Sequence, residues 1–428
     1  MKQILDLHIH SRYSRACSPQ LTLENLDRSC RRKGVDIIAT GDFTFPQWFS
    51  ALESELVETF AGSGLYRLAK AKDDKAKFIL GTEVSLVYKD GDRARRIHLV
   101  IHAPSLQAVA ELNKVLDKKY NIRSDGRPIL GISAPEFVRL LLSINPAFLV
   151  YPAHIWTPWY AVFGSKSGFD SLADCFKEET ENIYAIETGL SSDPAMNWRL
   201  SALDNLTILS SSDAHSLANI GREANVIELK SRPSYQEIYG IIKERRRFLP
   251  QSAGVSGLVE TLEFYPEEGM YHIDGHRDCG FSCLPAESRR LKGICPKCHK
   301  PLVIGVLSRV EELADRPEGF LPEKAVPFKK VVELDKIIAE ALNVKSRQSA
   351  KVQREYDSLL SQFGSELHIL LDQDLGSLVQ AKVDSRIIEG LRRARGGDLE
   401  IKPGFDGQYG EVKIFSDSNR PTKQLSWI

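Results

Sequence analysis

The 428-residue sequence lacks the features that would place it in a simple class. Lys plus Arg and Asp plus Glu each number 57, so the net charge is zero. A balanced chain has no global attraction to nucleic acid or to a membrane, and any nucleic-acid surface must be a local patch. No apolar run is long enough to span a bilayer, and Asp6 and two histidines interrupt the region where a signal peptide would lie. We therefore expect a soluble, cytoplasmic protein.

Cysteine is also sparse, with seven residues in the whole chain, and its distribution argues against a disulfide framework. Three cysteines are scattered, whereas four form two short-spaced pairs, Cys279 with Cys283 and Cys295 with Cys298. Tetrahedral zinc needs four soft ligands, and two turn-like knuckles supply them in the manner of a zinc ribbon. We expect structural zinc on these four thiolates. Of the nearby histidines, His272, His276 or His299 is the alternative to one cysteine.

The first dozen residues organise the rest of the chain. Apolar and polar residues alternate from Ile4 to His10, which is the period of a half-buried strand, so His8 and His10 leave the same face. That spacing predicts that both imidazoles bind the same metal ion. The alternative is two ordinary polar positions on a strand that faces solvent.

Apolar runs of strand length alternate with helical stretches through the first 250 residues. We expect strands over residues 34–42, 78–84, 96–102, 147–154, 185–189 and 206–215, and helices over 106–116 and 134–143. This alternation implies a parallel sheet buried on both sides. Each strand carries a His, Asp or Glu near its carboxyl end, and in a closed α/β barrel those ends meet on one rim. The residues expected there are His8, His10, Asp42, Glu83, His98, His154, Asp213 and His215.

Imidazoles and carboxylates together suit zinc, manganese or iron, and a carboxylate such as Glu83 can bridge two ions about 4 Å apart. This set predicts a polynuclear phosphoesterase-type site. The alternative is a group of satisfied polar residues in the core, and His102 is an additional imidazole close to the expected ligands.

These motifs resemble the PHP (polymerase and histidinol phosphatase) superfamily. The matching residues are His8-Ile9-His10, Gly41-Asp42-Phe43, Glu83 with His98, Tyr151-Pro152-Ala153-His154 and Ser212-Asp213-Ala214-His215. The resemblance implies a distorted (β/α)7 barrel over residues 1 to about 250, with two divalent ions of zinc, manganese or magnesium. It places His8, His10, Glu83 and Asp213 on one ion, and Glu83, His98 and His154 on the other.

The sequence departs from the superfamily pattern at two positions. Ser14-Arg15 stands where an acid is usual, and Phe43 replaces the second member of an Asp-His pair. Two ligands of the usual third metal are therefore missing, and we expect two ions in the barrel. Asp42, Asp213 and His215 remain as candidates for orienting the metal ligands through hydrogen bonds or for acid–base catalysis. Arg15 is a candidate for a fixed positive charge that binds a phosphate.

The chain changes character near residue 255. We expect the barrel over 1–255, a four-Cys zinc module over 265–310 and a mainly helical DNA-binding region over 311–428. Basic clusters at 245–247, 289–292 and 392–395 suggest contact with nucleic acid, although solvated helix faces are the alternative for each one. Among these, Arg392 and Arg393 precede a Gly-Gly turn suited to gripping a phosphate.

Aromatic residues near the rim suggest stacking on an extruded base, with a place in the core as the alternative. The candidates for DNA or base contact are Tyr13, Arg15, Phe43, Trp156, Trp159, Asn197, Arg199, Arg392 and Arg393. Asp193 precedes a proline near the same rim, so it is a candidate for catalysis or base reading, or a plain helix N-cap.

The whole arrangement resembles the endonuclease Q family within the superfamily. The resemblance rests on residues 13–16, 40–44 and 192–199, on the four cysteines and on residues 403–410. It implies a monomeric DNA repair endonuclease that cuts 5′ to uracil, hypoxanthine, xanthine or an abasic site. Residues 423–428 faintly resemble a sliding-clamp-binding tail. The alternatives are a phosphatase of small monoesters and a non-catalytic DNA-binding protein.

Overall fold

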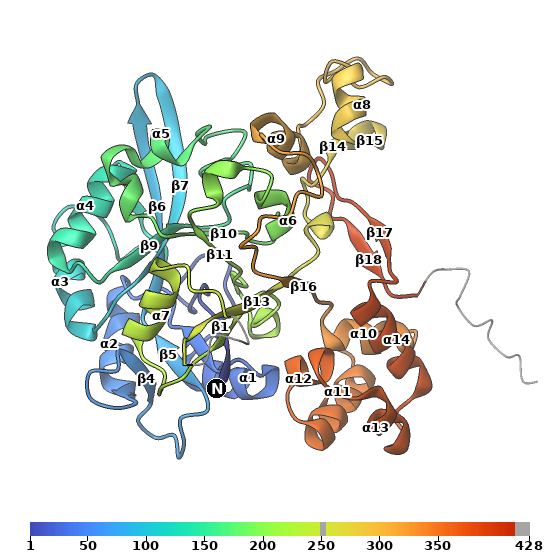
Figure 1. The fold of residues 1–428 in the computed structure, drawn as a ribbon, viewed down its shortest axis with the longest axis horizontal. Helices are drawn as coiled ribbons and strands as arrows, with labels where there is room; N and C mark the ends of the chain where they lie inside the picture. The colour runs from blue at the N-terminus through green and yellow to red at the C-terminus, as the bar shows by residue number, and fades with distance from the viewer. Residues whose placement is uncertain (249–253, 416–428) are drawn as a thin grey trace, which may run out of the picture.

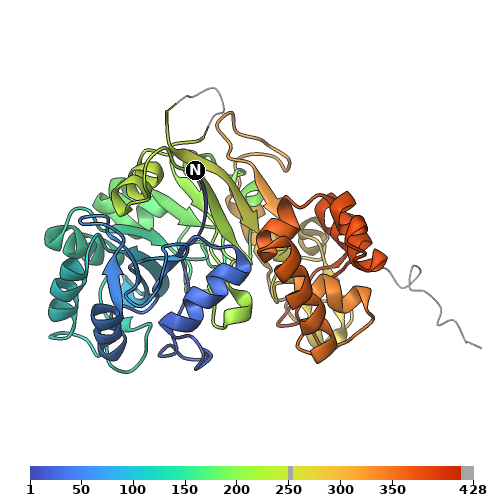
Figure 2. The ribbon, with the colours of Figure 1, turned by 90° about the horizontal axis from the view of Figure 1, so that it is seen from below.

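The computed structural model describes residues 1–248 and 254–415. Figure 1 shows a barrel built from the first 250 residues, with the C-terminal part of the chain beside it. Seen from below, the barrel and the C-terminal helices form neighbouring lobes (Figure 2). Across these two described ranges, no helix is long and apolar enough to cross a membrane.

The largest sheet forms one side of the barrel. Its parallel core consists of β1 (Lys2–Asp6), β2 (Ile37–Ala39) and β5 (Lys77–Ile79), and the strand order is β16-β13-β12-β1-β2-β5-β4-β3. The remaining strands are β3 (Leu56–Glu58), β4 (Leu65–Leu68), β12 (Ala224–Glu228), β13 (Gly257–Glu263) and β16 (Phe328–Lys330). The strand β12 runs antiparallel to β1, and β13 runs antiparallel to β12, so β13 has the same direction as β1.

Two smaller sheets complete the barrel. One has the order β8 (Ile129–Leu130), β6 (Gly81–Asp90), β7 (Arg93–His102) and β9 (Leu149–Pro152), and the other pairs β10 (Ala185–Glu187) with β11 (Thr207–Leu209) in parallel. Single backbone bonds link the sheets: Ile155 N–H donates to Glu187 O (3.0 Å), and His10 N–H donates to Ala214 O (3.1 Å). The short strands and sparse links explain the distortion of the barrel. The predicted fold class is confirmed.

The structure corrects one predicted strand and the expectation of a purely parallel sheet. Residues 78–84 do not form one strand, because the chain breaks at Leu80 between β5 and β6. The strands β6 and β7 form an antiparallel hairpin in which Asp90 pairs with Arg93. Only Gly91 and Asp92 connect them, and Gly91 has φ of 59°, the left-handed geometry that a two-residue hairpin loop requires.

Helices surround the barrel and fix the loops at its rim. They are α1 (Leu23–Lys33), α2 (Pro46–Glu55), α3 (Leu106–Leu116), α4 (Ala134–Ile144), α5 (Leu172–Phe176), α6 (Pro194–Asn197) and α7 (Tyr235–Lys243). The Thr22 hydroxyl caps α1 by accepting from Asn25 N–H, and Gly34 ends it in the left-handed region, so local sequence sets both ends. The helices α3 and α4 lie where periodicity predicted them.

The C-terminal part consists of a small β-ribbon, a helical bundle and a final pair of strands. The ribbon contains β14 (Asp274–His276), β15 (Phe281–Cys283), α8 (Pro285–Arg290) and α9 (Val306–Leu313). The bundle contains α10 (Leu334–Ala341), α11 (Ala350–Phe363), α12 (Glu366–Leu371), α13 (Leu375–Gln380) and α14 (Ser385–Gly396), followed by β17 (Glu400–Lys402) and β18 (Glu411–Lys413). Lys33 Nζ lies 2.7 Å from buried Glu366 Oε2, which ties α12 to the barrel helix α1.

Candidate metal centre

The strand β1 delivers the first two candidate ligands into the barrel interior. Beyond its end, His8 and His10 are buried, with 2% and 0% exposure, which excludes the solvent-facing alternative. Asp6 holds this strand against the last rim segments because its carboxylate accepts from Ser212 N–H (3.0 Å) and Gly221 N–H (2.9 Å). Burial raises the pKa of Asp6 to about 6. These two bonds therefore hold the strand β1 and the loop that contains Ser212 and Gly221 in a fixed relative position.

One group of candidate ligands comprises His8, His10, Glu83 and Asp213, whose donor atoms all lie within 4.8 Å of one another. His10 Nε2 lies 3.3 Å from Glu83 Oε2 and 3.1 Å from Asp213 Oδ1. His8 Nε2 lies 3.6 Å and 3.7 Å from the same two oxygens. The donor set and its spacing fit a divalent metal.

Three of these donor atoms are buried and have no hydrogen-bond partner: His8 Nε2, His10 Nε2 and Asp213 Oδ1. Buried polar atoms nearly always have a hydrogen-bond partner, and a group of buried atoms without one indicates a site for a water or an ion. All three belong to the same cluster, so a single bound cation would satisfy them together.

A second group comprises Glu83, His98 and His154. Glu83 Oε1 lies 2.8 Å from His98 Nδ1 and 3.0 Å from His154 Nε2, and the two imidazole nitrogens are 3.3 Å apart. The other oxygen of Glu83 faces the first group. A single carboxylate thus serves both groups, which is the geometry of a bridging ligand between two metals.

Outer carboxylates orient the imidazoles. Asp42 Oδ1 lies 3.0 Å from His10 Nδ1, and Glu187 contacts His8 Nδ1 at 3.0 Å and also accepts from His154 N–H at 2.9 Å. Such contacts fix which ring nitrogen faces the metal and raise its basicity. Asp42, His154 and Asp213 all have positive φ (47°, 31° and 46°), and this concentration of sparsely populated backbone geometry is typical of functional sites.

Charge in the site favours cation binding. Burial alone would lower the pKa of His8 and His10, but the surrounding carboxylates outweigh it and hold the pKa of both groups well above the ordinary range. For His8 these carboxylates are Glu187, Glu83 and Asp213. At His98 burial prevails and lowers the pKa to about 4, which keeps this imidazole in the neutral form that a metal requires.

Sequence reasoning missed Arg127, which reaches the same cluster. Its Nη1 lies 3.0 Å from Glu83 Oε2, and Glu83 raises the pKa of the guanidinium against the effect of burial. Arg127 follows Asp125 and Gly126 in a polar loop before β8, so it carries no strand-end signal. Arg15, the predicted fixed charge, is instead exposed, and its described contact is a backbone N–H bond to Asp125.

His215 lies at the open side of the site. Its ring centroid is 4.6 Å from that of His10, and its Nδ1 lies 2.8 Å from Asp213 O, which can accept a hydrogen bond from it. Burial lowers the pKa of this imidazole. The side chain keeps 30% exposure, so its remaining nitrogen is available on the solvent side.

Asp193 and Asn197 occupy structural positions in α6. Asp193 caps the helix by accepting from Met196 N–H (3.0 Å) and pairs with Lys330 Nζ at 3.0 Å; it belongs to neither barrel group. Asn197 is fully buried and accepts from Trp156 Nε1 at 2.8 Å. For Asp193 the structure therefore matches the N-cap alternative.

Two of the four predicted stacking aromatics belong to the core. Phe43 and Trp156 are 0% and 1% exposed, so neither offers a face on an exposed loop, and the core alternative holds for both. Tyr13 is half-buried and stacks on Phe45 with ring centroids 4.6 Å apart. Trp159 is 39% exposed and meets Tyr271 edge-on at 5.4 Å, which leaves it the most accessible of the four.

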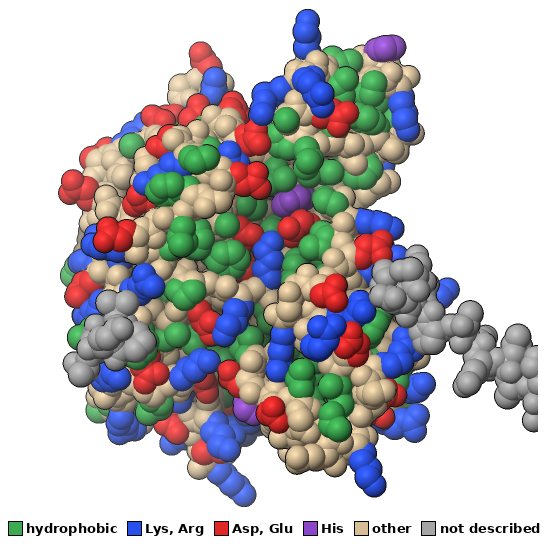
Figure 3. Space-filling view, turned by 45° about the vertical axis from the view of Figure 1, so that its right-hand side comes forward, with side chains coloured by type: hydrophobic (Ala, Val, Ile, Leu, Met, Phe, Trp, Pro, Cys, Tyr) green, Lys and Arg blue, Asp and Glu red, His purple; other side chains and the backbone are tan. Residues whose placement is uncertain are grey.

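The predicted basic contacts are largely paired within the protein. Arg392 and Arg393 both bind Glu389, at 2.8 Å and 2.7 Å, and the Arg199 guanidinium donates to Arg316 O at 3.4 Å. On the face seen in Figure 3, Lys and Arg side chains are interspersed with Asp and Glu and do not form one continuous basic surface. This distribution agrees with the zero net charge.

The ribbon places one histidine where the sequence predicted a cysteine. His276, Cys279, Cys295 and Cys298 have donor atoms within 4.8 Å of one another, and Cys283 is outside this group. Cys298 Sγ lies 3.8 Å from His276 Nδ1. Cys283 is on β15 opposite Asp274 and packs with Cys295 and Leu302 in a small core. The structure therefore favours the histidine alternative over Cys283 as the fourth donor.

Related sequences match this chain at moderate identity. A family profile described as the MJ0043 C-terminal domain matches residues 333–398, which contain α10 to α14. Over 261 residues, 60% of the chain, the identity to the uncharacterised protein MJ0043 of Methanocaldococcus jannaschii is 29%, and the match spans 31% of that protein. The uncharacterised protein YqxK of Bacillus subtilis is 27% identical over 432 residues, covering 96% of this chain and 100% of YqxK.

Two solved structures match almost the entire chain. The lesion-specific endonuclease PfuEndoQ of Pyrococcus furiosus has a TM-score of 0.83 and 29% identity, covering 99% of this chain and 98% of its own. Endonuclease Q in complex with a 27-mer duplex, with an abasic lesion at its active site, has a TM-score of 0.82 and 29% identity, covering 99% of both chains. The predicted resemblance to endonuclease Q is confirmed over nearly the whole chain.

Proposed function

We propose that the chain is a metal-dependent DNA repair endonuclease that hydrolyses the phosphodiester 5′ to a deaminated base or an abasic site. The observation that carries this proposal is Glu83, whose two carboxylate oxygens face two separate ligand groups. The similarity to a lesion-specific endonuclease supports DNA as the substrate. A mispaired base costs less to extrude from the duplex than a paired one, so this substrate class is also physically reasonable.

His8, His10, Glu83 and Asp213 would hold one divalent ion, and Glu83, His98 and His154 the other. When bound, such ions lower the pKa of a water and neutralise phosphate oxygens during in-line attack. Asp42 and Glu187 keep the imidazoles of His10 and His8, which follow β1, in the required tautomer. His215 is the half-exposed imidazole beside the site. With its Nδ1–H on Asp213 O, its other nitrogen would take up a proton from solvent and, as the imidazolium, would give that proton to the leaving oxygen.

Arg127 supplies the fixed positive charge that the sequence assigned to Arg15. Glu83, Asp213, Asp42 and Glu187 carry four negative charges, which two divalent ions would balance. The guanidinium of Arg127, 3.0 Å from Glu83, is then the surplus charge and favours an anionic phosphate at this position. Both the missing third-metal ligands and the presence of Arg127 therefore indicate a site in which a guanidinium, not a third ion, supplies the additional positive charge.

The remaining parts recognise the DNA around the lesion. Tyr13 and Trp159 are the accessible aromatics at the rim, suited to stacking on an extruded base or filling its gap. We assign the zinc module to residues 265–310 and the DNA-binding helical region to 311–428, in a monomer acting on DNA in the cell. The clamp-binding segment at 423–428 lies outside the described residues.

A substrate panel tests the function. The chain, stripped of metal and then supplied with Zn²⁺, Mn²⁺ or Mg²⁺, is incubated with end-labelled duplexes that carry uracil, hypoxanthine, an abasic site or normal bases. A chromogenic phosphate monoester is assayed in parallel. We expect a nick on the 5′ side of the lesion only. Turnover of the monoester alone would establish the phosphatase alternative, and DNA binding with no turnover of either substrate would establish the non-catalytic one.

A further inference from the structure

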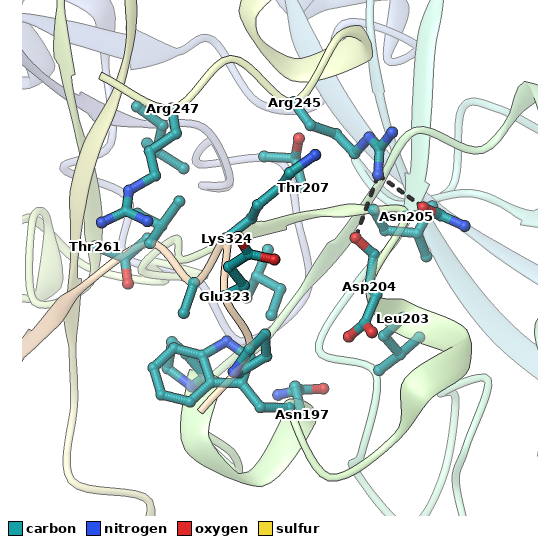
Figure 4. Close-up of a pocket in the computed structure, with 18 of the residues that line it drawn as sticks. Asn197, Leu203, Asp204, Asn205, Thr207, Arg245, Arg247, Thr261, Glu323 and Lys324 are labelled. Carbon is teal, nitrogen blue, oxygen red and sulfur yellow. Dashed lines mark hydrogen bonds between the residues drawn. The ribbon is translucent and has the colours of Figure 1, made fainter. Parts of the chain in front are cut away.

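A cavity of about 730 Å³ lies apart from the candidate metal centre, and none of the candidate ligands lines it. Its wall includes Thr207, the first residue of β11, and Leu258, near the start of β13. Its lining also extends to Asn197 and Trp198 at the end of α6. Figure 4 shows its polar wall, which brings together the end of α7, the loop before β11 and the segment 322–326.

Part of the charge in this wall is already neutralised inside the protein. Arg246 binds Glu244 at 2.8 Å and Glu237 at 3.3 Å. Asp204 is held by both guanidinium nitrogens of Arg316, one of them at 2.7 Å. Arg316 and Asp204 neutralise each other, and Arg246 with its two carboxylates carries one net negative charge.

Three cations and one acid remain. Arg245 contacts only neutral groups, Asn205 Oδ1 at 2.8 Å and Asp204 O at 3.3 Å. Within residues 1–248 and 254–415, Arg247, Lys324 and Glu323 make no hydrogen bond or ion pair. In Figure 4 Lys324 lies between Arg247 and Arg245. The cavity therefore has a surplus of positive charge without an internal partner, which favours an anion.

The rest of the lining is apolar and aromatic. Leu203 and Leu258 are 2% and 3% exposed and form buried parts of the wall, and Trp198, Pro322 and Val326 line the same space. Trp198 meets Phe328 edge-on at 5.6 Å, which fixes the position of the indole. An indole beside cations suits a ligand with both a planar ring and a phosphate.

We propose that this cavity binds a nucleoside phosphate, with the phosphate on Arg247 and Lys324 and the base against Trp198. Its volume lies within the range of small-molecule sites, about 300–1,000 Å³, and a cavity of that size holds a nucleotide but not a duplex. The site is separate from the metal centre, so nucleotide binding does not require barrel metal.

Isothermal titration with AMP, ATP and inorganic phosphate tests the site on the full chain after metal removal. We expect AMP and ATP to bind, phosphate to bind at least tenfold more weakly than AMP, and the double variant R247Q/K324Q to weaken AMP binding at least tenfold. The matched control is R28Q, which removes an exposed arginine outside the cavity and is expected to bind AMP as the unaltered chain does. Circular dichroism verifies that each variant is folded.

Four results would overturn the proposal. They are no nucleotide binding by the unaltered chain, equal binding by R247Q/K324Q, equal affinity for phosphate and AMP, and loss of AMP binding in H8A/H10A. The last of these would place the nucleotide in the barrel. Preference for a single-stranded oligonucleotide over AMP would instead make the cavity part of a nucleic-acid path, which also contradicts a nucleotide site.

Discussion

Arg127 and the metal-facing carboxylate of Glu83 are in direct contact, with Nη1 3.0 Å from Oε2. The same oxygen lies 3.3 Å from His10 Nε2 and 3.6 Å from His8 Nε2. One carboxylate oxygen therefore joins a fixed guanidinium to the first ligand group. In a chain without the usual third-metal ligands, this contact places a permanent positive charge beside the two candidate ions.

Substitution of Arg127 tests that role. We expect R127Q to lower kcat for nicking by about 10²- to 10³-fold, because a charge that stabilises the transition state is lost, and to weaken binding of lesion-containing duplex. R127K keeps the charge without the fork geometry and should recover part of the rate. Metal content measured by mass spectrometry should be the same in both variants as in the unaltered chain.

The matched control for Arg127 is R15Q, which removes an exposed arginine of the neighbouring loop. Its nicking rate should equal that of the unaltered chain. If R15Q lost activity while R127Q kept it, the fixed charge would belong to Arg15, as the sequence alone suggested.

Removal of the outer carboxylate at His10 should weaken metal binding without removing a ligand. D42N leaves a hydrogen-bonding group beside His10 Nδ1 but loses the charge, and outer-shell changes of this kind cost about 10- to 100-fold in metal affinity. Competition with a fluorescent chelator measures the change. D92N, at an exposed turn residue, is the control, and equal affinity in D42N and D92N would remove Asp42 from the metal site.

The pH dependence of stability should reveal the buried pair Glu223 and Glu263. Burial raises the pKa of Glu263 from 4.5 to about 8, and burial together with the charge of Glu263 raises that of Glu223. The folded state then keeps its proton at a pH where the unfolded chain has lost it. The resulting stabilisation is fully present below pH 4.5 and is lost as the pH rises through 8. Between pH 6 and 8 the free energy of unfolding should fall by on the order of 2 kcal/mol.

Urea unfolding at several pH values measures this effect. E263Q resembles the protonated acid and should flatten the fall in the free energy of unfolding between pH 6 and 8. E53Q, an exposed glutamate, should leave the slope unchanged. A slope that is the same in E263Q and in the unaltered chain would show that Glu263 is ionised in the folded protein.

Zinc retention separates the two possible donor sets of the ribbon. H276A and C279S should both lose ribbon zinc to a chelator faster than the unaltered chain, because each removes a member of the cluster. H299A, at an exposed neighbouring histidine, is the control. Zinc loss in C283S together with retention in H276A would restore the four-thiolate site that cysteine spacing predicted.

Local sequence predicted the barrel and most of the residues that cluster inside it. Four candidate ligands follow strand ends, namely His8, His10, His154 and Asp213, whereas Glu83 and His98 lie within the strands β6 and β7. Tertiary contacts decide what the sequence could not show. Arg127 reaches Glu83 because Gly126 N–H binds Tyr13 O (3.0 Å) and Gly126 O accepts from the Thr44 hydroxyl (3.3 Å), and these contacts position its loop. Periodicity also missed the β6–β7 hairpin, because both strands are buried where they cross the barrel.

Residue type alone also could not separate core aromatics from surface ones. Phe43 and Trp156 follow predicted strands in the same way as the exposed Trp159, yet only the folded chain buries them. Similarly, Cys283 has ideal knuckle spacing and packs against the other three cysteines, but the donor atom within 4.8 Å of all three belongs to His276. In both cases packing, rather than spacing, selects the outcome.

The most direct test of the account compares the unaltered chain with E83Q on one end-labelled duplex that carries a single hypoxanthine, at saturating Mn²⁺. The account predicts a nick 5′ to the lesion by the unaltered chain, loss of nicking by at least 10³-fold in E83Q because both ligand groups lose their shared carboxylate, and retained binding of the duplex. Equal nicking by E83Q, or no lesion-dependent nick by the unaltered chain in any divalent metal, would contradict it.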